Sequence, residues 1–172
     1  MSFVFTLTKI LKIKKNSFLK SLNTFEGLPH RYEIFYKRKK NLFINDSKAT
    51  SFQATKVALE NTKNIFWILG GLPKKNDKIL LKKIKKNIIK AYIIGNNINF
   101  FKKQIRNQVE VFTARNLKNS VIQILKDIKV FKKKNNTILL SPASASYDQF
   151  SNFEERGKQF KKLCIYYARK YI

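Results

Sequence analysis

The sequence is poor in the residues on which catalytic and metal sites of small proteins usually depend. Its 172 residues include one cysteine, Cys164, and one histidine, His30. A single cysteine excludes an internal disulfide framework and is typical of a reducing compartment. One cysteine and one histidine are too few for a metal-ligand cluster. His30 stands in a Gly-Leu-Pro turn, which we expect to lie far from any serine or cysteine loop, so we expect no Ser-His-Asp or Cys-His catalytic set.

The sequence also lacks long apolar runs and a phosphate-binding loop. No apolar run reaches the ~18 residues that a membrane helix needs, and no GxxxxGK[ST] motif occurs. The start of the chain has neither the basic segment nor the small-residue cleavage site of a signal peptide. We therefore expect a cytoplasmic protein without a membrane span, whose role is to bind and orient a ligand.

Acidic residues are scarce as well. Ten Asp and Glu stand against 37 Lys and Arg, which gives a formal net charge of +27. Such an excess is typical of proteins that bind a polyanion, either nucleic acid or an anionic membrane. However, the lysines are scattered along the chain, and arginine, the usual reader of phosphates and base edges, is rare. AT-rich codons for Lys, Asn and Ile are the favoured explanation of the charge, and a basic nucleic-acid-binding module is kept as the alternative.

What the sequence does contain is a regular alternation of strand-like and helical patterns. Residues 31–45 read as a hairpin, and buried strands are expected at 65–69, 91–94, 109–112 and 137–140. Helices are expected at 51–61, 77–86, 97–107, 117–128 and 149–171. This order predicts a Rossmann-like three-layer α/β sandwich. Its mostly parallel sheet would have five to six strands, one antiparallel edge strand, and helices on both faces.

The first 25 residues differ from the rest. They have an approximate helical pattern, and the Gly27-Leu28-Pro29 turn that follows marks a boundary. We expect a helical segment over 1–25 and an α/β domain over 26–172. In the last helix Cys164 shares the apolar stripe, so we interpret it as a core residue without redox chemistry.

Three loops with small or charged residues follow expected parallel strands, at 46–48, 70–74 and 141–146. Carboxyl ends of parallel strands lie at one edge of a sheet, where ligands bind. Lys48, Lys74 and the hydroxyls of Ser144 and Ser146 would suit a small dicarboxylate. A helix opened by Ser151, with Glu154 at capping-box spacing, would add a terminus that favours anions. Ordinary strand-to-helix connections and solvated surface lysines are the alternative interpretation.

Three motifs resemble the D-glutamate-adding Mur ligases, the UDP-N-acetylmuramoyl-L-alanine:D-glutamate ligases. They occur in the family's order, as GLPHR at 27–31, NDSKAT at 45–50 and SPASASYDQFSNFEERG at 141–157. The resemblance covers about residue 25 to the end of the chain. The DNPR-type motif of sibling ligases that add lysine or diaminopimelate is absent, which favours D-glutamate as the amino acid.

The resemblance implies the C-terminal domain of a three-domain peptidoglycan ligase, with 1–25 as a remnant of the central ATPase domain. The whole enzyme would use ATP and Mg²⁺, with the magnesium ligands in the missing N-terminal and central domains. ATP would phosphorylate UDP-N-acetylmuramoyl-L-alanine, and the amine of D-glutamate would attack the acyl phosphate. This chain would hold no catalytic residue and no metal, and would be inactive alone. An inert gene fragment is a third alternative that the sequence does not separate from the first.

Motif by motif, the resemblance also assigns individual roles. Arg31 and Asp46 would contact the nucleotide. The residues assigned to D-glutamate binding are Lys48, Thr50, Lys74, Ser146 and Phe153. Around Lys74 the sequence departs from the family, because Leu72-Pro73 stands where small or polar residues are usual.

Overall fold

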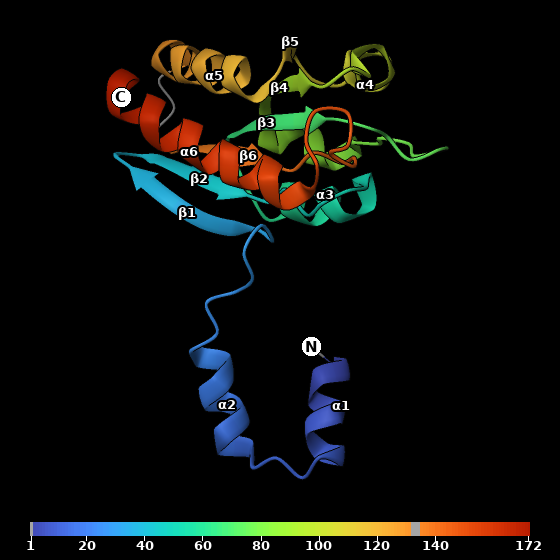
Figure 1. The fold of residues 1–172 in the computed structure, drawn as a ribbon, viewed down its shortest axis with the longest axis vertical. Coiled ribbons are helices and arrows are strands. Elements are labelled where there is room, and N and C mark those ends of the chain that lie inside the picture. Colours follow the sequence, from blue (N-terminus) through green and yellow to red (C-terminus); the bar gives the residue numbers. More distant parts are fainter. Residues whose placement is uncertain (1, 132–134) are drawn as a thin grey trace.

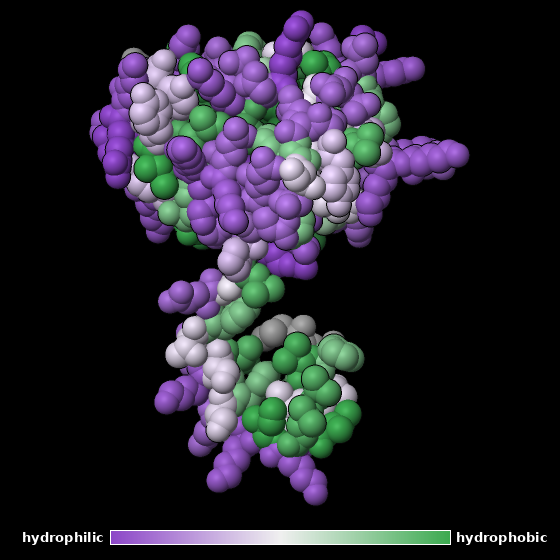
Figure 2. Space-filling view, viewed as in Figure 1, coloured by the Kyte–Doolittle hydropathy of each residue, from purple (hydrophilic) through white to green (hydrophobic). Residues whose placement is uncertain are grey.

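The chain forms a helical hairpin and an α/β body, which a linker connects (Figure 1). A computed structural model describes residues 2–131 and 135–172. The hairpin consists of α1 (Ser2–Ile10) and α2 (Lys15–Asn23). The segment is thus helical, as the sequence predicted. The rings of Phe5 and Phe18 face each other with centroids 6.0 Å apart, yet no side chain within 3–25 is buried. Figure 2 shows the resulting apolar surface on the hairpin, below the largely polar face of the body.

The α/β body (residues 30–172) is built on a six-stranded sheet with strand order β1-β2-β6-β3-β4-β5. The edge strand β1 runs antiparallel to β2, and all other pairings are parallel. This arrangement confirms the predicted fold class. The last strand in sequence, β6, lies between β2 and β3 in the sheet. The loop at 141–146 therefore lies between the loops that follow β2 and β3. The strands are β1 (Glu33–Arg38), β2 (Asn41–Asn45), β3 (Ile65–Gly70), β4 (Ile88–Ile94), β5 (Val111–Arg115) and β6 (Asn136–Leu140).

Helices cover both faces of the sheet and make two separate cores. On one face lie α3 (Phe52–Glu60), the 3₁₀ helix η1 (Lys82–Asn87) and α4 (Ile98–Ile105), and on the other lie α5 (Leu117–Phe131) and α6 (Phe153–Tyr171). Every residue of β3 is buried. Trp67 and Leu69 pack on the α3 side, whereas Phe66 and Ile68 pack on the α5 side. Cys164 is fully buried in the α5–α6 core, which confirms its assignment to packing.

The expected helix over 77–86 is wrong. Residues 77–81 have no regular secondary structure, and only the 3₁₀ helix η1 follows. Leu80 is 57% exposed, while Leu81 is buried. The reason lies in Gln104 of α4 and in Gln108, just beyond its end, whose side chains accept hydrogen bonds from the backbone N–H groups of Ile79 and Leu81. These side-chain amides replace the hydrogen bonds that a helix would supply.

Two helices start later than predicted, α6 at Phe153 and not at 149, and α3 at Phe52 and not at 51. The N-cap of α6 is Asn152, not Ser151, and its side chain accepts from the N–H of Glu155. The carboxylate of Glu155 accepts from the N–H of Ser151, the residue before the cap, so the capping spacing is shifted by one residue from the predicted Ser151 and Glu154. In α3 the N-cap is Ser51, whose side chain accepts from the N–H of Ala54. The expected strand at 109–112 lies at 111–115 instead. No described helix is both long enough and apolar enough to cross a membrane.

Candidate functional site

The loops that follow β2, β3 and β6 meet at one edge of the sheet, as the sequence predicted from strand order. Backbone hydrogen bonds join them directly. The N–H of Asp46 donates to Leu140 O at 2.8 Å, and the N–H of Gly70 donates to Pro142 O at 2.9 Å. Leu72 and Ala145 exchange a reciprocal pair at 2.9 and 3.0 Å. The three loops therefore form one connected structure at the carboxyl ends of the strands.

A buried arginine, to which the sequence analysis assigned no role, lies where these loops touch. Arg156, in the first turns of α6, is 1% exposed. Its Nε donates to Ser47 Oγ at 3.0 Å, and its Nη2 donates to Ser47 O at 2.8 Å and Ser144 O at 3.1 Å. Burial lowers the pKa of the guanidinium to about 10, and the charge of Asp148 acts in the opposite direction. The available signal was its spacing, because Phe153, Arg156 and Phe160 share one helix face.

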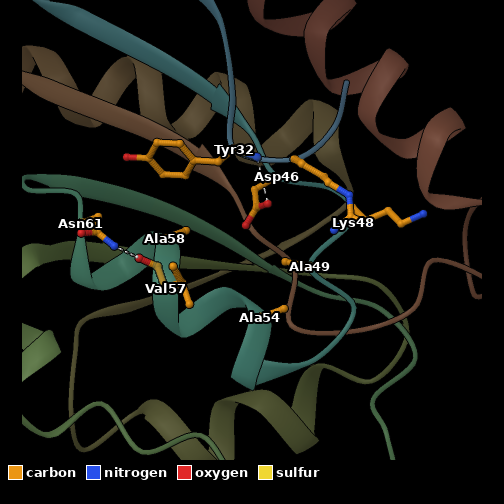
Figure 3. Close-up of a pocket in the computed structure, with 9 residues that line it drawn as sticks. Tyr32, Asp46, Lys48, Ala49, Ala54, Val57, Ala58 and Asn61 are labelled. Carbon is orange, nitrogen blue, oxygen red and sulfur yellow. Dashed lines mark hydrogen bonds between the residues drawn. The ribbon is translucent and has the colours of Figure 1, made fainter. Parts of the chain in front are cut away.

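An open pocket of about 390 Å³ lies between the turn at 30–32, the loop at 46–49 and α3 (Figure 3). Three of the predicted site residues, Arg31, Asp46 and Lys48, are among those that line it. Figure 3 shows Ala54, Val57 and Ala58 of α3 as the wall opposite Asp46. The pocket thus combines an apolar wall with two cations and a carboxylate.

Asp46 is fixed between two other segments of the site. Its Oδ1 accepts from the N–H of Tyr32 at 3.1 Å, and its Oδ2 accepts from the hydroxyl of Ser141 at 2.7 Å. Burial raises the pKa of this carboxyl, outweighing the hydrogen bonds and the charge of Arg31, which act in the opposite direction. The carboxylate ties the turn before β1 to the loop after β6 and forms part of the pocket surface.

Lys48 and Phe153, both assigned to D-glutamate binding, are brought together. The Nζ of Lys48 lies 4.0 Å from the centroid of the Phe153 ring, which is the geometry of a cation–π contact. The backbone N–H of Lys48 donates to His30 O at 3.0 Å. Phe153 therefore adjoins the pocket through Lys48, although it is not one of the lining residues.

His30 is buried and holds the GLPHR turn against this loop. Asn45 Oδ1 accepts from the N–H of Ser47, which turns Asn45 Nδ2 toward His30 Nδ1 at 2.8 Å. The ring nitrogen is thus an acceptor, and burial lowers the pKa of the imidazole. A Cβ on Gly157 would lie 2.2 Å from this nitrogen, so α6 packs on the ring only because residue 157 is glycine. The expectation that His30 lies far from any serine loop is wrong, because its turn contacts the loop that contains Ser47. The imidazole itself is hydrogen-bonded to Asn45 and not to a serine.

The remaining predicted residues lie outside the pocket. Lys74 is exposed in the loop after β3. Thr50 is half-buried where the second motif meets α3, and Ser146 is buried in the 141–146 loop, where its carbonyl accepts from Gln149 and Phe150. Within the described residues no group of three or more His, Cys, Asp or Glu side chains could hold a metal ion.

Fold and site together define a Rossmann-like α/β unit whose parallel strands end in three linked polar loops. No family model matches the sequence. Among curated proteins, the chain is similar to UDP-N-acetylmuramoylalanine–D-glutamate ligases from three bacteria. Identity is 38% over 155 residues for Wolbachia sp. subsp. Brugia malayi, covering 90% of this chain and 31% of the relative. It is 39% over 168 residues for Fusobacterium nucleatum (95% and 38%) and 40% over 150 residues for Bartonella henselae (87% and 32%).

These relatives confirm the resemblance that the three motifs indicated. The chain is homologous to part of a D-glutamate-adding Mur ligase, at 34–40% identity over about 90% of its length. The chain spans about a third of the length of the curated relatives it matches.

Proposed function

We propose that this chain is the amino-acid-binding part of an ATP-dependent ligase that joins D-glutamate to UDP-N-acetylmuramoyl-L-alanine in peptidoglycan precursor synthesis. The observation that carries the proposal is the gathering of Arg31, Asp46 and Lys48 in one pocket of a chain homologous to such ligases. In this view the α/β body is the C-terminal domain. The segment 1–25 belongs to the preceding central domain, which would cover the apolar side chains that the hairpin exposes.

D-Glutamate brings two carboxylates and one amine to the site. Lys48 is the principal cation for one carboxylate, held by its contact with the Phe153 ring. Thr50 and Ser146 supply hydroxyls at the same strand ends. Lys74, on the exposed loop after β3, would pair with the other carboxylate once that loop approaches the ligand.

The nucleotide is assigned to the pocket itself. Arg31 offers a guanidinium that suits phosphate oxygens. The carboxylate of Asp46 can accept further hydrogen bonds beside those from Tyr32 and Ser141. The apolar wall from α3 would lie against the flat or apolar part of the nucleotide.

The chain's contribution to the reaction is positioning. ATP transfers its γ-phosphoryl group to the carboxylate of UDP-N-acetylmuramoyl-L-alanine, the amine attacks the acyl carbon, and inorganic phosphate leaves. Holding the amine close to that carbon can supply much of the rate. Magnesium would be bound by the domains that this chain does not include, since the described residues offer no ligand cluster.

The test is D-glutamate-dependent release of phosphate from ATP in the presence of UDP-N-acetylmuramoyl-L-alanine. It is run on the chain alone and on the chain fused behind the first two domains of a related ligase. We expect activity in the fusion only. Within the fusion, Lys48→Ala should raise the KM for D-glutamate about 10-fold or more, because a charged hydrogen bond is lost. Lys56→Ala is the control and should leave this KM unchanged, because the Lys56 side chain lies on α3, is 44% exposed and pairs with Glu60 instead of lining the pocket. The proposal would be contradicted if the fusion folds but releases no phosphate, or if the chain alone turns over ATP.

The net charge of +27 is the one observation that favours a nucleic-acid partner instead. Binding driven by phosphate contacts falls steeply with salt. Titration of a single-stranded oligonucleotide at low and at physiological salt therefore separates the two candidates. Tight binding that persists at physiological salt, together with a silent fusion, would favour the nucleic-acid role.

A further inference from the structure

We propose that Arg156 is a positioning residue of this site. It locks the three strand-end loops together and thereby holds Lys48 over the ring of Phe153. For the identity of the ligand this inference rests on the proposed function, whereas the coupling between the loops does not depend on it.

The geometry of the guanidinium is the first argument. Arg156 bonds two loops at once, through Ser47 Oγ and Ser47 O on one side and Ser144 O on the other. These loops follow β2 and β6, which are neighbours in the sheet. A planar fork with several N–H donors in fixed directions can satisfy three acceptors of this kind, and a lysine ammonium on a flexible stem cannot reproduce it.

The hydroxyl of Ser47 carries the restraint to Lys48. It accepts from Arg156 Nε, so its own single proton is directed to Phe153 O at 2.8 Å. Ser47 is therefore held between two residues of α6. The next residue, Lys48, has its backbone N–H bound to His30 O. With its backbone held on both sides, the Lys48 side chain extends over the Phe153 ring.

The third loop joins through Gly71. A Cβ at this position would lie 2.2 Å from Ala145 O, 2.7 Å from Ser144 Oγ and 3.3 Å from Arg156 Nη1. Only a glycine lets the loop after β3 approach the guanidinium so closely. The reciprocal hydrogen bonds between Leu72 and Ala145 then fix the contact.

The charge of Arg156 is the last argument. In the described part of the chain its hydrogen-bond acceptors are one hydroxyl and two carbonyl oxygens, none of them a carboxylate. A buried cation whose hydrogen-bond partners are all neutral is costly to the fold, and the charge of Asp148 offsets only part of that cost. The cation also leaves a positive potential at the strand ends, which attracts a dianionic ligand. The fold therefore accepts a stability cost at the place where an anion would bind.

The loop coupling is tested on the full chain by NMR with Arg156→Met and, as the matched control, Arg169→Met. Arg169 lies exposed near the end of the same helix. We expect Arg156→Met to abolish the ring-current shift of the Lys48 ε-protons and to speed amide exchange of Lys48, Leu72 and Ala145 about 10-fold or more. Amides of β3 and β4 should keep their exchange rates, and Arg169→Met should match the wild type.

A second pair of variants keeps the test decisive if Arg156→Met does not fold. Ser47→Ala removes only the hydroxyl between Arg156 and Phe153 and should reduce the Lys48 shift in a folded chain. Arg156→Lys keeps the positive charge without the planar guanidinium, and amide exchange in the loops should be as fast as in Arg156→Met. A Lys48 shift and loop exchange at wild-type values in these variants would overturn the proposal.

The ligand half is measured in the fusion enzyme. Arg156→Lys and Ser47→Ala should raise the KM for D-glutamate while the KM for ATP stays unchanged, a split that a general loss of stability would not produce. If the wild-type fusion is silent, the proposed function is refuted. If its variants nevertheless show faster amide exchange in the loops, the loop coupling still stands. An unchanged KM in an active fusion would overturn the positioning role.

Discussion

The hairpin and the α/β body use the same kinds of apolar side chain with opposite results. Phe3 in α1 is 77% exposed, whereas Phe66 in β3 is fully buried. Both segments adopt regular structure, but only the second has layers on two sides to exclude water. Short helices draw most of their stability from tertiary packing. The hairpin therefore shows what the sequence forms locally, and the body shows what holds a structure together.

The largest expected effect comes from making one substitution in both regions. Phe66→Ala should lower the free energy of unfolding by about 3–5 kcal/mol, because it removes a ring packed near Tyr92 and Phe131 and leaves a cavity. Phe3→Ala should change it by less than about 0.5 kcal/mol. Urea unfolding, followed by tryptophan fluorescence of Trp67, measures both. Equal effects would mean that the hairpin is buried in the native chain.

A polar network in the body sharpens the same contrast. Asp127 accepts from the Tyr92 hydroxyl at 2.6 Å and pairs with Lys90 at 3.0 Å. Burial alone raises the pKa of Asp127, but hydrogen bonds from Tyr92, Lys90 and Gln123 outweigh it and leave the pKa lowered. Asp127→Ala should cost about 1–3 kcal/mol, because the Tyr92 hydroxyl loses its partner in the core.

Thr24→Ala in the hairpin is the matched control for Asp127→Ala. It removes a hydroxyl that donates to Lys20 O in full contact with solvent. Water replaces that partner, so the free energy of unfolding should not change measurably. A loss of stability as large as that of Asp127→Ala would show that exposure does not separate the two regions.

Strand order, layers and the strand-end site follow from the sequence because they depend on patterns that repeat along the chain. The failures depend on single tertiary contacts. Residues 77–81 have a helical spacing of apolar side chains, but the side chains of Gln104 and Gln108 bind their backbone and keep them out of a helix. No local pattern predicts that two glutamines later in the chain will do so.

Within the site, the motifs assigned Arg31 and Asp46 to a nucleotide and Lys48 to D-glutamate, and the structure places all three along one pocket. The role of Arg156 could not be predicted in the same way. A sequence shows an arginine one helical turn from Phe153, but its partners are a hydroxyl and two carbonyls from loops 12 and 109 residues away. Only the assembled sheet brings those oxygens to one point.

The next effect is smaller and depends on pH. Burial keeps the pKa of His30 below its ordinary value of 6.5. The unfolded chain therefore takes up a proton that the folded body resists, and stability should fall as pH drops below about 6.5. His30 is the only histidine, so His30→Gln should flatten this slope between pH 7.5 and 5.5. The hairpin has no acidic residue or histidine over 2–25, so its helical circular dichroism should not titrate in that range. A slope that persists in His30→Gln would refute the assignment.

The smallest expected effect is that of deleting residues 1–25 from the chain. Because no described side chain of 3–25 is buried, removing the segment should leave the free energy of unfolding of the body within about 0.5 kcal/mol. It should also reduce self-association, since the deletion removes the exposed Phe3, Ile10 and Leu11. Urea unfolding and analytical ultracentrifugation measure the two quantities. A loss of more than about 2 kcal/mol would mean that the hairpin packs on the body in solution. In the fusion enzyme the same deletion should instead lower activity, because there the central domain would bury the side chains that this chain leaves in water.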